Sequence, residues 1–120
     1  MRSVEDILRE SRVIAMVGLS PNPERYSYRT AQYLQEQGYR VIPVNPSAAE
    51  ILGERCYADL SQVSEKVDLV YIIRNSRDVP PIVDQAVAMG AKVVWMHEEV
   101  SHDEAGQKAQ MSGLDVVMDR

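Results

Sequence analysis

Five short runs of apolar residues constrain the fold of this chain more than any other feature of its sequence. They are RVIAMVG at 12–18, RVIPVN at 40–45, VDLVYII at 67–73, AKVVWM at 91–96 and LDVVM at 114–118. Nearly continuous runs of this kind, without strict alternation of polar and apolar residues, are typical of strands that are buried on both faces. The sequence therefore predicts a parallel sheet that is covered by helices on both sides.

Helical patterns fill most of the chain between these runs. Apolar residues recur there at three- and four-residue spacing, which is the period of an amphipathic helix. Ser3 is the predicted N-cap of the first helix, and Ser101 with Glu104 forms a capping-box pattern at the start of the last. The predicted helices lie within residues 1–11, 28–39, 79–91 and 101–114.

The segment 47–66 has a less regular pattern. Its first part predicts a short helix that ends at Gly53, and a loop follows. The alternation of strands and helices along the rest of the chain predicts a right-handed, doubly wound sheet. The fold class is therefore α/β: a single Rossmann-like domain over residues 1–120, with a parallel five-stranded sheet and helices on both faces. The first strand is expected to be central, with the topological switch point beside it.

Bulk composition narrows the classes of function. The formal net charge of −5 disfavours nucleic-acid binding, which needs a basic face. A single cysteine allows no internal disulfide, and no apolar run approaches the roughly 20 residues of a membrane span. We therefore expect a cytoplasmic protein without membrane or nucleic-acid partners, either a monomer or a weak homodimer.

Arginines and small polar residues follow the predicted strands. In an open parallel sheet, ligands bind beyond the carboxyl ends of the strands, near the switch point. Arginines, hydroxyl groups and helix N-termini at such an edge suit phosphate groups. The residues concerned are Gly18, Leu19, Ser20, Arg25 and Ser27 after the first strand, Asn45 and Pro46 after the second, Ile73, Arg74 and Arg77 around the end of the third, and His97 after the fourth.

Each of these residues also has a simpler interpretation. Gly18 allows a tight turn between strand and helix, and Ser27 is more readily explained as a helix cap. The dinucleotide signature fails in both halves, because the turn has one glycine and no acidic residue closes the second strand. The Walker A pattern is absent as well. The sequence thus favours a phosphate-bearing ligand other than a conventionally bound NAD or ATP.

Four segments carry a resemblance to a known family. VGLSPNPERYSYR, GYRVIPVNP, ILGERCYADL and GLDVVMDR resemble, in this order, the small stand-alone coenzyme A-binding proteins. Those proteins share their Rossmann-like domain with the N-terminal part of the succinyl-CoA synthetase α subunit. The similarity covers nearly the whole chain. It implies that the ligand is coenzyme A (CoA) or an acyl-CoA.

The resemblance also implies roles for individual residues. The 3′-phospho-ADP part of CoA would lie over Gly18, Leu19 and Ser20, and Arg25 and Ser27 would contact its phosphates. Asn45 and Pro46 would flank the adenosine, and Ile73 and Arg74 would line the route beyond the third strand. The chain departs from the family after the fourth strand, where Trp95-Met96-His97-Glu98-Glu99 replaces a pattern with glutamine and then glycine.

Two alternatives remain open beside a non-catalytic CoA-binding protein. The first is a small enzyme that acts on an acyl-CoA or a nicotinamide nucleotide, with His97 as its acid–base residue. The second is an interaction module that keeps the fold without the ligand, which Glu98 and Glu99 suggest. His97 and His102 are five residues apart rather than four, so they do not match a zincin helix, and no metal site is predicted. Cys56 is interpreted as packing rather than as a reactive thiol.

Overall fold

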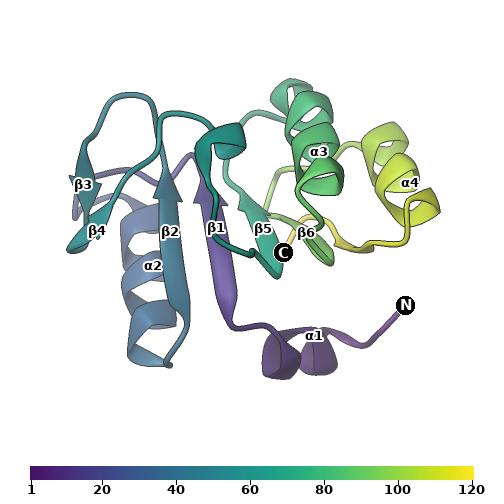
Figure 1. Ribbon diagram of the computed structural model, residues 1–120, viewed down its shortest axis with the longest axis horizontal. Helices are drawn as coiled ribbons and strands as arrows, with labels where there is room; N and C mark the ends of the chain where they lie inside the picture. Colours follow the sequence, from purple (N-terminus) through teal and green to yellow (C-terminus); the bar gives the residue numbers. More distant parts are fainter.

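A five-stranded parallel sheet forms the centre of the computed structural model, which describes residues 1–120 (Figure 1). Its spatial order is β2-β1-β5-β6-β7, and every neighbouring pair is parallel. The predicted α/β fold is therefore confirmed. The first strand lies inside the sheet but is not central, because the middle strand is β5. The strands are β1 (Val13–Val17), β2 (Arg40–Val44), β5 (Leu69–Ile72), β6 (Val93–Met96) and β7 (Asp115–Val117).

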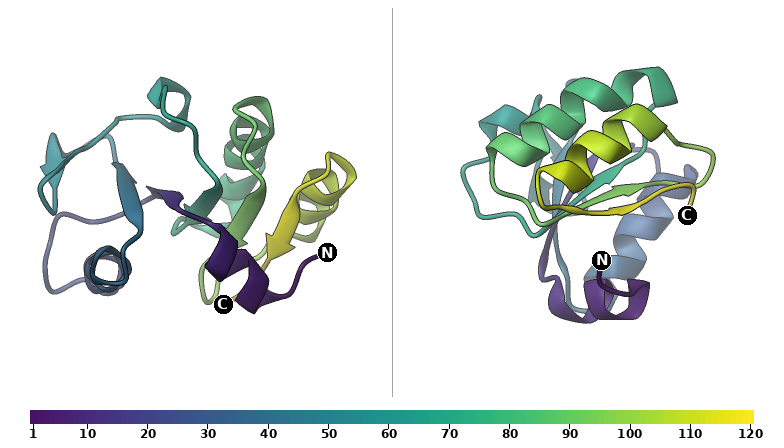
Figure 2. Two further views of the ribbon diagram at one scale, coloured as in Figure 1. Left: turned by 60° about the horizontal axis from the view of Figure 1, so that its bottom comes forward. Right: turned by 90° about the vertical axis from the view of Figure 1, so that its right-hand side faces the viewer.

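Helices cover both faces of the sheet, as the apolar runs predict. The helices α3 (Val79–Ala88) and α4 (Asp103–Met111) lie side by side on one face (Figure 2). The helices α1 (Val4–Glu10) and α2 (Tyr26–Glu36) lie on the other. Two separate hydrophobic clusters of 21 and 13 buried residues fill the two interfaces. None of the helices has the length and apolar character that crossing a bilayer requires.

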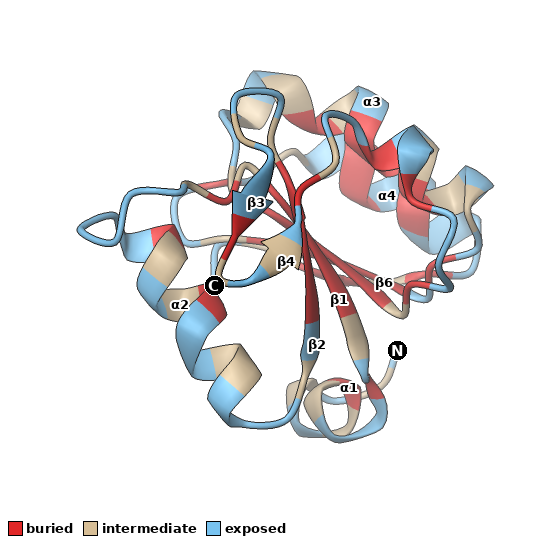
Figure 3. Ribbon diagram, turned by 60° about the vertical axis from the view of Figure 1, so that its left-hand side comes forward, coloured by how far each residue is buried: buried red, intermediate tan, exposed pale blue.

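The predicted short helix ending at Gly53 is wrong. The segment instead forms a two-stranded antiparallel hairpin of β3 (Glu50–Ile51) and β4 (Glu54–Arg55). Its two turn residues, Leu52 and Gly53, have φ of 52° and 77°, and positive φ at both positions is what a type I′ hairpin turn needs. Ile51 is buried in the same hydrophobic cluster as Ala31 of α2, and Figure 3 shows β3 with one buried and one exposed part. Burial of this side chain therefore overrides the local helical preference.

Asp68 fastens three strands together at the amino edge of the sheet. One carboxylate oxygen accepts hydrogen bonds from the backbone N–H groups of Arg12 and Val13, both at 2.9 Å. The backbone carbonyl of the same residue accepts from Lys92 and Val93 at 2.9 and 3.1 Å. A single residue thus joins the starts of β1, β5 and β6.

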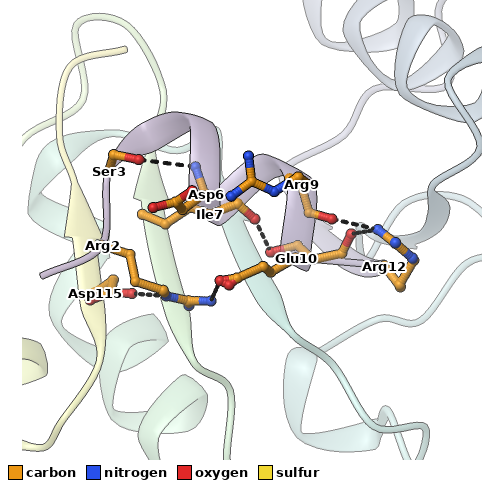
Figure 4. A network of polar contacts seen from close by, with 9 residues as sticks. Arg2, Ser3, Asp6, Ile7, Arg9, Glu10, Arg12 and Asp115 are labelled. Carbon is orange, nitrogen blue, oxygen red and sulfur yellow. Dashed lines mark hydrogen bonds and ion pairs between the residues drawn. The ribbon is translucent and has the colours of Figure 1, made fainter.

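The N-terminal helix is capped as expected, and the residues around it contact β7, the edge strand of the sheet. The Ser3 hydroxyl oxygen accepts from the Asp6 N–H at 3.1 Å, which confirms Ser3 as the N-cap (Figure 4). Arg2 donates to Asp115 of β7 at 2.6 Å and lies 3.5 Å from Glu10. These contacts join the start of the chain both to β7 and to the last residue of α1.

The predicted capping box of the last helix is wrong in detail. His102, not Ser101, is the N-cap of α4, and its Nδ1 accepts from the Ala105 N–H at 3.1 Å. The Ser101 N–H donates instead to the hydroxyl of Ser76, in the 3₁₀ helix η2 (Ser76–Asp78) that precedes α3. This bond joins the loops after β5 and β6, which helps to shape the carboxyl edge of the sheet.

Candidate functional site

Three strand ends meet at Gly18. Its N–H donates to the carbonyl of Val44 at the end of β2, at 2.9 Å. Its φ is 98°, and a Cβ at this position would lie 2.1 Å from the carbonyl oxygen of Ile73, which follows β5. No other residue type tolerates both this backbone conformation and this contact without a shift of the chain. Glycine is therefore required for the close crossing of the loops after β1 and β5.

An open cleft of about 670 Å³ lies beside this crossing. Arg25 reaches it from the N-cap position of α2, Arg74 from the loop after β5, and His97 from the end of β6. The remaining lining residues are Ile73, Asn75, Ser76, Glu98, Glu99 and Val100. The structure thus brings together four predicted residues, Arg25, Ile73, Arg74 and His97, in one hollow.

The two arginines of the cleft differ in their present partners. Arg74 lies 3.6 Å from Asp78 in an exposed pair. None of the seven ion pairs of the chain involves Arg25. Arg77, by contrast, is exposed on η2 and does not line the cleft. Exposed ion pairs contribute roughly 0–1 kcal/mol, so an anionic ligand could replace Asp78 at little cost.

Ser27 stabilises the loop rather than capping α2. The N-cap of α2 is Arg25, and no side chain caps this helix. The buried Ser27 hydroxyl accepts instead from the Ser20 N–H at 3.1 Å, and the Ser20 hydroxyl accepts from Asn22 at 3.1 Å. The predicted cap is thus wrong, and Ser27 fixes the turn through which β1 enters α2. Neither Ser20 nor Ser27 lines the cleft.

The residues predicted to flank an adenosine lie on the other side of Gly18. The Leu19 side chain is fully buried in the core, and its carbonyl accepts from Asn45 Nδ2 at 2.8 Å. Asn45 Oδ1 accepts from the Ser47 N–H at 2.7 Å, and Pro46 is exposed. These residues shape the surface beyond β1 and β2, but they do not share the hollow of the arginines.

A group of aromatic rings around His97 was not predicted. The rings of Tyr26 and Tyr71 lie 5.2 and 5.7 Å from the imidazole, and the Tyr71 hydroxyl is 2.8 Å from His97 Nδ1. Burial raises the pKa of Tyr71 to about 12, so the phenol keeps its proton, and a hydrogen bond joins its oxygen to His97 Nδ1. Nothing in the sequence indicates this arrangement, because the three residues come from distant elements.

The loop that carries His97 is held in an unusual conformation. Glu99 has φ of 70°, a left-handed backbone that suits glycine far better than glutamate. Its N–H donates to Asp119 Oδ1 at 2.6 Å, beyond the end of β7. The Val100 N–H donates to the carbonyl of His97 at 2.8 Å. The loop is therefore fixed from β7 and from η2, with Glu98 and Glu99 on the wall of the cleft.

Two other groups of the sequence have no place in this cleft. Cys56 is buried in the same hydrophobic cluster as Ala31 of α2, and burial raises the pKa of its thiol, which disfavours the reactive thiolate. No three side chains of histidine, cysteine, aspartate or glutamate lie close enough together to hold a metal ion.

A separate hollow of about 340 Å³ lies between α3 and α4, and the Lys108–Asp84 ion pair at 2.6 Å crosses it.

Comparison with known proteins finds relatives of this chain in both sequence and fold. Uncharacterized protein YneT of Bacillus subtilis is 34% identical over 116 residues, which are 97% of this chain and 86% of YneT. A hypothetical protein from Pyrococcus horikoshii has a solved structure that superimposes with a TM-score of 0.92 at 38% identity, covering 100% of this chain and 90% of that one. The ADP-forming acetate–CoA ligase of Methanocaldococcus jannaschii is 27% identical over 79 residues, which are 66% of this chain and 11% of the enzyme.

The family model described as "CoA binding domain" matches residues 12–120, which include all five strands of the sheet and the whole cleft. Only the N-terminal helix lies outside the match. The likeness to CoA-binding proteins that the sequence motifs suggested is thus confirmed, and this chain belongs to the CoA-binding domain family.

Proposed function

We propose that this protein binds coenzyme A or an acyl-CoA through its 3′-phospho-ADP moiety at the carboxyl edge of the sheet, without catalysis of its own. One observation carries the proposal. Two guanidinium groups, Arg25 and Arg74, line the same cleft, next to the glycine at which three strand ends meet. In this proposal residues 1–120 form one CoA-binding domain, in which 1–11 supply the N-terminal helix.

The negative charge of CoA suits the two arginines of the cleft. Its three phosphates carry roughly −4 near neutral pH, since a phosphomonoester alone carries about −1.5 to −2. Arginine binds phosphate oxygens through paired, charge-assisted hydrogen bonds. The N-terminus of α2 adds to this, because it has neither a side-chain cap nor an acidic residue in its first turn. Its free N–H groups and its dipole favour an anion.

The proposed arrangement assigns one part of the ligand to each side of Gly18. The pyrophosphate lies over the backbone of Gly18, Leu19 and Ser20, with Arg25 and Arg74 as counter-ions, and Ser27 holds the loop in place. Asn45 and Pro46 lie on the adenosine side, beyond β2. The pantetheine leaves past Ile73 towards His97, through the cleft between the loops after β5 and β6.

Isothermal titration calorimetry with CoA, dephospho-CoA and NAD tests the proposal. We expect CoA to bind more tightly than dephospho-CoA, because the missing 3′-phosphate removes negative charge. NAD should bind most weakly, since the chain lacks an acidic residue for its ribose. Equal indifference to all three ligands would refute the proposal, and a preference for NAD would point to a nicotinamide enzyme.

The variant Arg25→Ala tests directly whether this arginine binds the phosphates of CoA. Hydrogen bonds to charged groups contribute about 1.5–3 kcal/mol, so we expect CoA affinity to fall roughly tenfold to a hundredfold. Arg77→Ala is the matched control, because this arginine is exposed outside the cleft. Similar losses in both variants would mean that only the overall charge matters. No loss in either would place the phosphates elsewhere.

The hydrogen bond between Tyr71 and His97 favours a second candidate function, that of a small enzyme acting on an acyl-CoA. It fixes an imidazole at the end of the cleft, where it could act on an acyl-CoA as an acid or base. Turnover of acyl-CoA thioesters by the purified protein, lost in His97→Ala, would support an enzyme. The cytoplasmic location and the monomeric or weakly dimeric state also stay predictions, which cell fractionation and light scattering would test.

A further inference from the structure

We infer that Glu98 and Glu99 make the cleft selective for CoA thioesters whose acyl group carries no negative charge. The inference rests on the proposed function and adds the class of ligand to it. Acetyl-CoA represents the class that the cleft should accept, and succinyl-CoA the class that it should reject.

The cleft is lined by charges of both signs. Arg25 and Arg74 line it together with Glu98 and Glu99, and no ion pair joins these arginines to these carboxylates. The same two carboxylates, with His97 and Tyr26, also line an adjoining hollow of about 260 Å³. The negative charge of Glu98 is felt at Tyr71, where it contributes to the raised pKa of the phenol. The part of the site around His97 therefore combines aromatic rings with negative charge.

The backbone at Glu99 supplies an independent reason to assign a role to its side chain. A glutamate with φ of 70° costs free energy that glycine would avoid. The conformation persists because Asp119 holds the N–H of Glu99 and Ser76 holds that of Ser101. Strained residues at the wall of a binding cleft point to a function of the side chain that is retained there.

The direction of the ligand brings its acyl end to these carboxylates. When the phosphates lie at Gly18 and Arg25, the pantetheine extends from β1 across β5 towards β6, which is the order of these strands in the sheet. The loop after β6 begins with His97 and continues with Glu98 and Glu99. A neutral acyl group meets the rings of Tyr26 and His97 there, whereas a terminal carboxylate meets two like charges.

The expected size of the discrimination follows from electrostatics near a protein surface. Unit charges several ångströms apart, partly exposed to water, repel each other enough to change affinity by a factor of a few per carboxylate. Two carboxylates should therefore disfavour succinyl-CoA by roughly tenfold relative to acetyl-CoA at low salt. The preference should shrink as salt is added, because these carboxylates are exposed.

Calorimetric titration of the full chain with acetyl-CoA and succinyl-CoA tests the inference. We expect the wild type to prefer acetyl-CoA roughly tenfold, and the double variant E98Q/E99Q to bind both ligands about equally. Glu5→Gln, which removes an exposed carboxylate on α1, should leave the preference unchanged. If the wild type binds both ligands equally, the selectivity is refuted while the proposed function stands. If neither ligand binds, both are refuted.

Comparing Glu99→Gly with Glu99→Gln distinguishes the effect of the carboxylate charge from the effect of the strained backbone. The glycine variant removes one carboxylate and also relieves the left-handed strain, so we expect a higher melting temperature together with a smaller preference for acetyl-CoA. Glu99→Gln keeps the strain, and it should reduce the preference without raising the melting temperature. A preference that is unchanged in both variants would contradict a role for the Glu99 carboxylate.

Discussion

Replacement of Gly18 by alanine tests the geometry on which the cleft depends. The new Cβ would lie 2.1 Å from the Ile73 carbonyl oxygen and 2.9 Å from Arg74 Cδ. The first contact is with backbone, so the loops after β1 and β5 must separate. Left-handed φ costs roughly 1–2 kcal/mol for a residue with a Cβ, and overpacking adds about 1–3 kcal/mol. We therefore expect the free energy of unfolding to fall by about 2–5 kcal/mol.

Gly38→Ala is the matched control for this variant. Gly38 has φ of 94°, close to the 98° of Gly18, but nothing lies within 4 Å of a Cβ built there. Its alanine variant should therefore lose only the cost of left-handed φ, about 1–2 kcal/mol. The difference between the two variants measures the contact with Ile73 separately from the backbone conformation.

Urea unfolding, followed by circular dichroism, measures both variants, and CoA titration of the folded protein measures the cleft. We expect Gly18→Ala to weaken CoA binding because the separated loops displace Arg74, while Gly38→Ala binds as the wild type does. If both variants lose the same stability, the crossing at Gly18 is not as close as described. If Gly18→Ala is destabilised but binds CoA normally, the crossing does not support the proposed site.

Two further predictions concern hydrogen bonds near the cleft. Ser27→Ala leaves the Ser20 N–H without its acceptor, so urea unfolding should show a loss of about 1 kcal/mol and CoA titration a weaker affinity. Tyr71→Phe tests the raised pKa. The native phenol titrates near pH 12 but the unfolded one near pH 10, so wild-type stability should fall as the pH rises between about 10 and 12. The phenylalanine variant should lack this decline, and an identical alkaline profile would contradict the burial of Tyr71.

The sheet could be predicted from the sequence because its strands are buried on both faces. Burial on both sides leaves a continuous apolar run, and such runs survive as a local signal. The hairpin at 50–55 could not be predicted, since Ala48, Ala49 and Leu52 favour a helix locally. What decides its fold is the burial of Ile51 in the cluster that also holds Ala31 of α2 and Val41 of β2, which is a tertiary effect.

The candidate site was only partly predictable, for the same physical reason. Strand ends locate Gly18, Arg25 and Arg74, because the carboxyl ends of parallel strands meet at one edge. The role of Ser27 depends on a partner seven residues away in a turn whose shape the sequence does not define. The pair of Tyr71 and His97 depends on the register between β5 and β6. Such contacts need the sheet in three dimensions.

The position of Asp68 has a consequence for how freely the cleft can change. Asp68 holds β1 through its carboxylate and β6 through its backbone carbonyl, so it aligns these strands at the edge opposite the cleft. A slip by one residue would turn the whole hydrophobic set of a strand outward, and Asp68 opposes it from the opposite end of the molecule. Apart from Gly18, the loops after β1, β5 and β6 can therefore accept new side chains, by mutation or by design, while the scaffold beneath them keeps its alignment at the amino edge.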